Sequence, residues 1–255
     1  MSSEAATLLA SFIIVTAIIV VLSRLSKGRI EAKEEELRRS VTLRGWTFGK
    51  KNERGYRIYT FSGTTDGVAW EAESAKLVAG SSKGQRRRHI ARWHGKWSPG
   101  VSAPIVAMGV PTGKEVMTYK IARGDGFFAR MAQKAAGYAL DMGIDIYFGK
   151  EIGAEIDAQT LKHVEAPSVP GYIFMAGNPD EAKRILAEGL QRSLLDATSD
   201  KTNVLSEEDR PYLLLRPHSI SLARMEQIRD VGELEQFVKA GVSLTRAFRF
   251  GRPIS

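Results

Sequence analysis

Cysteine is absent from this chain of 255 residues, and histidine is scarce. The absence of cysteine excludes disulfide bonds, thiolate zinc sites, iron–sulfur clusters and thiol nucleophiles. The four histidines are His89, His94, His163 and His218. His89 and His94 are five residues apart in an expected strand, where an odd spacing places side chains on opposite faces. The sequence therefore predicts neither a metal site nor a bound cofactor.

Charge, proline and glycine are all missing from residues 5–23, AATLLASFIIVTAIIVVLS. A helix of this length measures about 28 Å at about 1.5 Å per residue, close to the roughly 30 Å hydrocarbon core of a bilayer. A cleaved secretory signal fits poorly, because Glu4 and no lysine or arginine precede the run. A buried core helix would carry a polar stripe. Residues 5–23 are therefore predicted to be a transmembrane helix, with 1–4 as an outer tail.

Basic residues follow the predicted span at once. Arg24, Lys27 and Arg29 lie within a few residues of its C-terminal end. Short cytoplasmic flanks are rich in lysine and arginine, so we expect the following domain in the cytoplasm and the N-terminus outside. We therefore expect a membrane location, with the domain on the cytoplasmic side. The same three side chains are expected to contact anionic lipid headgroups.

Small residues recur along the predicted span. Ala6, Ala10 and Ala17 are separated by four and seven residues, which places them roughly on one helix face. Small faces let membrane helices approach one another closely. We expect this face to pack against a helix of a partner, while isoleucine and valine side chains meet lipid.

Residues 24–45 are predicted to be a basic and charged juxtamembrane stalk, helical from about Ile30 to Leu43. Glu34 with Arg38, and Glu35 with Arg39, have the i,i+4 spacing that supports an exposed helix. A short coiled-coil contact with a partner is the alternative, although fewer than three heptads are available. The net charge of +8 suits a domain held near an anionic cytoplasmic leaflet.

Alternation of apolar and polar residues begins at Trp46, and residues 46–122 are predicted to be a first, β-rich lobe. Asp66 and Gly67 separate two alternating runs, which is the pattern of a β-hairpin. The glycine- and serine-rich basic stretch 78–88 is expected to be a mobile loop. Strands are expected at 46–48, 56–62, 68–75, 89–97 and 104–110.

Helix and strand patterns alternate in residues 123–255, the predicted second lobe of α+β class. Asn178 and Pro179 announce a helix start, as do Asp230 and Glu233 at capping-box spacing. Further elements are expected as an amphipathic helix over 126–142 and strands at 171–177 and 211–217. The whole chain is thus predicted to be an α+β protein, in which one transmembrane helix precedes a cytoplasmic antiparallel sheet with packed helices in two lobes.

The densest basic run contains Lys83, Arg86, Arg87, Arg88, Arg92 and Lys96, close to Trp93 and Trp97. Interleaved basic and aromatic residues can bind nucleic acid. A solvated loop, or a loop on anionic lipid or protein, fits a membrane-anchored chain better. We therefore expect Arg86, Arg87 and Arg88 to contact lipid headgroups, and we expect no nucleic acid partner.

No catalytic constellation is recognisable. Asp141 and Asp145 lack an identifiable partner base, and Asp66 is explained as a turn residue. The glycines near Lys114 do not have the spacing of a phosphate-binding loop. The sequence therefore predicts a protein that is not an enzyme.

Three motifs, RGWTF (44–48), GTTDGVAWE (63–71) and ARWHGKW (91–97), carry a resemblance. The chain resembles a group of uncharacterised bacterial single-span membrane-anchored proteins, and this resemblance implies no activity. In layout, though not in motif, it is similar to the H subunit of purple-bacterial photosynthetic reaction centres.

These observations predict a non-enzymatic accessory, assembly or structural subunit of an inner-membrane complex, such as a photosynthetic or respiratory one. Its expected partners are integral membrane proteins and anionic lipid headgroups. The alternative is a membrane-surface enzyme or ligand-binding module. That alternative requires a pocket between the lobes, lined by Arg123, Asp125 or His163.

Overall fold

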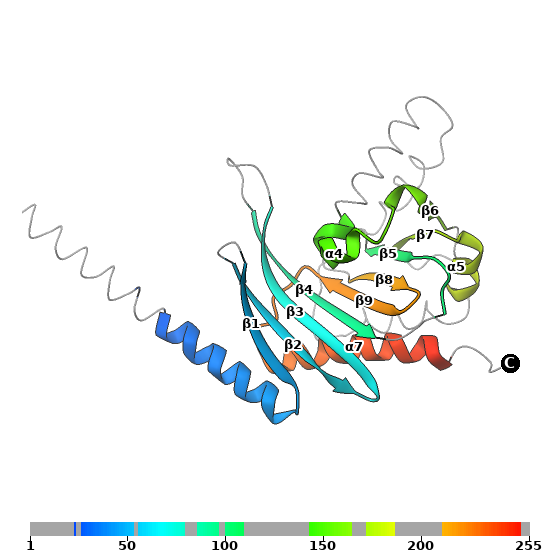
Figure 1. The fold of residues 1–255 in the computed structure, drawn as a ribbon. Helices are drawn as coiled ribbons and strands as arrows, with labels where there is room; N and C mark the ends of the chain where they lie inside the picture. Colours follow the sequence, from blue (N-terminus) through cyan, green and yellow to red (C-terminus); the bar gives the residue numbers. More distant parts are fainter. Residues whose placement is uncertain are drawn as a thin grey trace, which may run out of the picture. The chain divides into compact units, whose positions relative to one another are not determined.

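The computed structural model describes residues 23, 27–53, 56–79, 86–96, 100–109, 143–164, 172–186 and 211–250 (Figure 1). The chain divides into two compact units, Met1–Gly45 and Trp46–Ser255. The predicted span 5–23 lies outside the described residues except for Ser23. Within the described ranges, no helix combines the length and the apolar character needed to cross a membrane.

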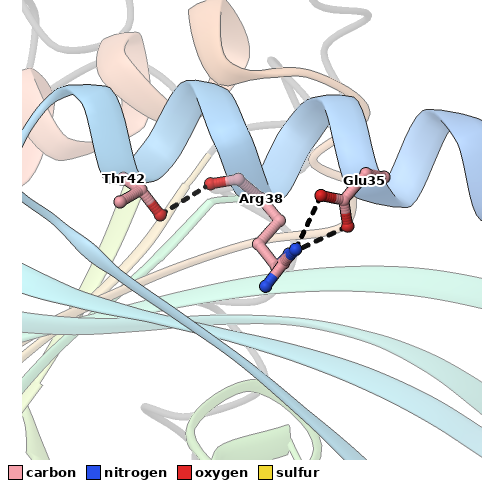
Figure 2. A network of polar contacts seen from close by, with 3 residues as sticks. All are labelled: Glu35, Arg38 and Thr42. Carbon is pink, nitrogen blue, oxygen red and sulfur yellow. Dashed lines mark hydrogen bonds and ion pairs between the residues drawn. The ribbon is translucent and has the colours of Figure 1, made fainter.

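The described part of the first unit is a helix over residues 27–43. Arg38 donates two hydrogen bonds to Glu35, from Nε at 2.9 Å and from Nη2 at 2.6 Å (Figure 2). The sequence predicted Glu34 as the partner of Arg38, but the guanidinium fork matches both carboxylate oxygens of Glu35 at a spacing of three. The hydrogen bond from Arg38 lowers the pKa of Glu35, and the charges of Arg38 and Arg39 add to this effect. Both partners are exposed, so this pair orders the helix surface only.

The described part of the second unit is built on one antiparallel sheet of nine strands, in the order β1-β2-β3-β4-β9-β8-β5-β7-β6 (Figure 1). The strands are β1 Thr47–Glu53, β2 Tyr56–Thr65, β3 Val68–Ala79, β4 Arg86–Lys96, β5 Ile105–Gly109, β6 Lys162–His163, β7 Tyr172–Ala176, β8 Tyr212–Arg216 and β9 Ser219–Arg224. The helices are α4 Lys150–Gly153, the 3-10 helix η1 Ala158–Thr160, α5 Pro179–Ile185 and α7 Val231–Phe250, with further helical residues over 143–148. The α+β class and the antiparallel sheet are confirmed.

Strands from both predicted lobes share this sheet. β9 pairs with β4 over six residues, from Ala91 opposite Arg224 to Lys96 opposite Ser219. β5 pairs with β8 on one side and with β7 on the other. The predicted boundary at residue 122 therefore does not separate two sheets, because distant strands pair across it.

The predicted hairpin is confirmed and is longer than expected. Asp66 and Gly67 occupy the turn between β2 and β3 with φ of 50° and 76°, the positive values that a two-residue hairpin turn requires. Stretch 78–88, which the sequence predicted to be a mobile loop, is β-strand at both of its described ends. Val78 and Ala79 continue β3, and they pair with Arg87 and Arg86 at the start of β4.

One face of the sheet, here called the tryptophan face, carries Trp93 and packs against α7. Helix α7 lies along β3, β4 and β9 (Figure 1). Trp93 is fully buried, and Gly241 of α7 lies directly over it. A Cβ atom at position 241 would lie 2.4 Å from the nearest ring atom, so glycine permits this close approach. The predicted inward residues of α7 are all buried: Leu234, Phe237, Val238 and Leu244.

The opposite face, here called the charged face, is covered in part by residues 143–161. The apolar side chains Ile144, Phe148, Ile156, Ala158 and Leu161 form a core with Val106, Leu214 and Ala223 of the sheet. Tyr147 stacks on Tyr212 of β8 with ring centroids 3.5 Å apart. The helical segments within 143–161 were not predicted from the sequence. The helix expected over 126–142 lies outside the described residues.

Two helices begin where the sequence predicted their N-terminal caps. Asn178 accepts a hydrogen bond from the backbone of Glu181 at 3.2 Å, with Pro179 at the first helical position. Asp230 accepts one from the backbone of Glu233 at 2.9 Å. Both caps satisfy backbone N–H groups that a helix start leaves without internal partners.

Candidate functional site

Five polar side chains gather at the centre of the charged face. Antiparallel register places Glu73 of β3 opposite Arg92 of β4, and His94 of β4 opposite Ser221 of β9. Alternate residues of a strand share a face, so all four lie on the same side of the sheet. Arg216 of β8 joins them and interacts electrostatically with His94. We call this set the charged cluster: Glu73, Arg92, His94, Arg216 and Ser221.

Arg92 connects the sheet to the segment that covers it. Its guanidinium pairs with Glu73. It also donates from Nε to the carbonyl of Tyr147 at 2.9 Å and from Nη2 to the carbonyl of Ile146 at 2.6 Å. The side chain of Arg92 is only 11% exposed and that of Glu73 is 29% exposed. Arg92 therefore satisfies two carbonyls at the C-terminal end of helical residues 143–148, where a positive charge also suits the helix dipole.

His94 and Ser221 form the centre of the charged cluster. The Nδ1 atom of His94 lies 2.9 Å from the Oγ atom of Ser221. Burial lowers the pKa of His94 to about 4, with further lowering by Arg216 and Arg92 and partial compensation by Glu73 and Glu71. The imidazole is therefore neutral near pH 7.

Arg216 marks the edge of the charged cluster. Its Nη1 atom pairs with Glu155, which follows α4, and only 18% of its side chain is exposed. The Nε atom of Arg216 is buried without a hydrogen-bond partner among the described residues. Lys96 and Glu71 form a neighbouring ion pair at 2.9 Å, and both of their side chains are mostly exposed.

The polar groups of the charged cluster are bonded mainly to other groups of the domain and hold its elements together. Ser221 is fully buried, so its hydroxyl does not reach solvent, and Arg92 is engaged with three protein groups. A nucleophile needs both an adjacent base and access to the reacting atom. Among the described residues, no group of three or more histidine, aspartate or glutamate side chains is arranged to hold a metal ion.

Four of the nine residues predicted to contact lipid or a partner helix lie outside the described part of the chain. These are Ala6, Ala10, Ala17 and Arg24. Lys27 and Arg29 are exposed at the start of the helix over 27–43. Lys27 lies 3.9 Å from Glu31, one helical turn along the chain.

The three arginines predicted to contact lipid, Arg86, Arg87 and Arg88, begin β4. They pair with β3, Arg88 standing opposite Leu77. They therefore belong to a strand of the sheet, whereas the sequence placed them in a loop. Trp93 is buried core, as predicted, and Trp97 lies outside the described residues.

The carboxylates considered for catalysis have structural surroundings where they are described. Asp66 pairs with Arg246 of α7 at 2.8 Å, which ties the hairpin turn to the helix. The Oδ1 atom of Asp145 lies against Gly153, where a Cβ atom would be 1.9 Å away. Asp141 lies outside the described residues, as do Arg123 and Asp125, two of the residues expected to line a pocket. The third, His163, lies in β6, opposite Met175 of β7.

The charged cluster was not predicted from the sequence, although the register of the β3–β4 hairpin gave one indication of it. Glu73 and Arg92 are equally far from the centre of the β3–β4 connection, so extending the hairpin register would have placed them opposite one another. The resemblance carried by RGWTF, GTTDGVAWE and ARWHGKW stays a prediction. No protein-family model matches the chain, and neither a curated protein nor a solved structure matches it.

Proposed function

We propose that this protein is a non-enzymatic, membrane-anchored accessory or assembly subunit of a bacterial inner-membrane complex. In this proposal residues 5–23 insert into the bilayer, and the sheet domain lies in the cytoplasm. There it binds other proteins and anionic lipid headgroups. The length of the apolar run 5–23 supports a membrane anchor. The basic residues Arg24, Lys27 and Arg29 support its orientation, with the C-terminal end of the span in the cytoplasm.

The observation that carries the non-enzymatic part is the way the charged cluster is used. Arg92 donates to the carbonyls of Ile146 and Tyr147 and pairs with Glu73. Its charge therefore fixes residues 143–148 on the sheet. Ser221, which contacts His94, is fully buried. Buried polar networks of this kind give a domain one rigid arrangement, which a docking platform requires.

The test is purification of the tagged full chain from native membranes in mild detergent, followed by identification of the proteins that co-migrate with it. A stoichiometric set of integral membrane proteins is expected. A chain that migrates alone, or that turns over a substrate through a group of the charged cluster, would contradict the proposal. Membranes carrying the untagged chain provide the background.

A paired variant tests how the span contributes. Replacing Ala10 and Ala17 by leucine fills the small face while keeping the segment apolar, so insertion should persist and the partner should be lost. The matched control is leucine at Ile13 and Ile18, which keeps bulk on the β-branched face. If the alanine double variant still co-purifies fully with its partner, the span is only an anchor.

A further inference from the structure

The edge of the sheet formed by β1 and β2 is basic. Residues 47–65 contain four basic residues, Lys50, Lys51, Arg54 and Arg57, and one acidic residue, Glu53. Lys50, Lys51 and Arg57 are exposed. Because neighbouring residues of a strand point to opposite faces, Lys50 and Lys51 present positive charge on both sides of the edge.

Aromatic side chains accompany these charges. Phe48 and Tyr59 are half-buried, with ring centroids 5.7 Å apart, and Tyr59 stands opposite Lys50 in the register. The Nη1 atom of Arg57 donates to the Tyr59 hydroxyl at 3.5 Å. Basic residues beside amphipathic aromatic rings suit a membrane interface, where headgroups are anionic and the ring body meets the acyl boundary.

We propose that the β1–β2 hairpin docks on anionic lipid headgroups of the membrane that anchors the chain, through Lys50, Lys51 and Arg57. This inference rests on the proposed function, because the anchor brings the hairpin to the bilayer. Only residues 24–46 separate the predicted span from β1 in the sequence, so anchoring the chain raises the effective concentration of lipid at the hairpin.

A peptide strand added to β1 is the competing occupant. β1 is the outermost strand on this side of the described sheet, and the backbone groups of an outermost strand are a template for pairing with another chain. Lysines on an edge strand oppose such pairing, and β1 carries two in succession. The same lysines favour a lipid surface, which needs charge and no backbone register.

The experiment uses the full chain in nanodiscs of phosphatidylcholine alone or of phosphatidylcholine with phosphatidylglycerol. Brief treatment with an amine-reactive reagent and mass spectrometry give a labelling rate for each lysine. Lys50 and Lys51 should label about fivefold more slowly with phosphatidylglycerol, and high salt should remove the difference. Lys162 and Lys239, which are exposed elsewhere on the domain, serve as references and should label equally in both.

Charge-reversal variants sharpen the result. Lys51→Glu should abolish the protection of Lys50, whereas Lys239→Glu should leave it intact. Equal labelling of Lys50 and Lys51 in both nanodiscs would overturn the hairpin proposal and leave the anchor standing. Protection in native membranes but not in phosphatidylglycerol nanodiscs would assign the edge to a protein partner instead. A chain that fails to enter nanodiscs at all would overturn both proposals.

Discussion

The imidazole of His94 on β4 and the hydroxyl of Ser221 on β9 meet with Nδ1 and Oγ 2.9 Å apart. These two strands come from opposite halves of the sequence, and their pairing joins strands β1 to β4 to the rest of the sheet. The contact lies within the charged cluster, so its protonation state bears on the stability of the whole domain.

Acid is expected to destabilise the domain through His94. The folded-state pKa is about 4, below the ordinary value of 6.5, so the unfolded chain binds more protons between these values. The contribution of His94 to the free energy of unfolding is fully present above pH 6.5. It is lost as the pH falls toward 4, at up to about 1.4 kcal/mol for each pH unit. Urea unfolding of the full chain in detergent at pH 7 and pH 5 measures it.

Two variants separate His94 from other titrating groups. His94→Gln should reduce the difference in unfolding free energy between pH 7 and pH 5. His218→Gln, at an exposed turn position between β8 and β9, should leave that difference unchanged. An unchanged pH dependence in His94→Gln would mean that other groups control the acid response.

Replacing Arg92 by methionine is expected to reduce the unfolding free energy by about 3 kcal/mol. The change leaves Glu73 without its charge partner and removes the donors to the carbonyls of Ile146 and Tyr147. The matched control is Lys96→Met, which breaks the exposed pair with Glu71 and should cost less than about 1 kcal/mol. Similar losses in the two variants would contradict the role assigned to Arg92.

Alanine at Gly241 is expected to destabilise the domain, although alanine favours helices. The added Cβ atom would lie 2.4 to 2.6 Å from three ring atoms of Trp93, which is fully buried and cannot yield. Overpacking of this kind costs about 1 to 3 kcal/mol, which exceeds the gain in helix propensity of about 1 kcal/mol. Gly143→Ala, with nothing within 4 Å of the new Cβ atom, should be neutral or slightly stabilising. Thermal unfolding followed by tryptophan fluorescence compares the two.

A reporter fused after Ser255 is expected to be active in the cytoplasm. The positive charges of Arg24, Lys27 and Arg29 resist translocation and keep the end of the span that bears them inside. Replacing all three by glutamine should weaken this preference and give mixed orientations. A reporter active only in the periplasm would reverse the proposed topology.

Local patterns predicted individual elements well. The turn at Asp66 and Gly67 and the cap at Asn178 follow from backbone requirements that one or two residues decide. The burial of Trp93 follows from alternation along β4, because an apolar residue between polar neighbours faces the core.

The order of the strands could not be predicted in the same way. The strand β9 was not expected, because Pro217 and His218 follow β8 directly. The strand is also only six residues long and mixes polar with apolar side chains. The pairing of β9 with β4 depends on contacts between residues more than 120 positions apart, such as Lys96 with Ser219. Consecutive strands usually lie side by side, so a pairing between strands from the two predicted lobes was not expected. The charged cluster was missed for the same reason, since its members come from four strands.

The place of β9 between β4 and β8 also has a consequence for biosynthesis. After β4 leaves the ribosome, about 120 more residues must be made before its partner strand exists, which takes roughly 6 to 24 s at about 5 to 20 residues per second. During that interval β4 is an open edge, and unpaired edges recruit other strands. Nascent chains stalled before Ser219 should therefore associate through β4, and a chaperone or the membrane surface would be needed to shield it until the last two strands arrive.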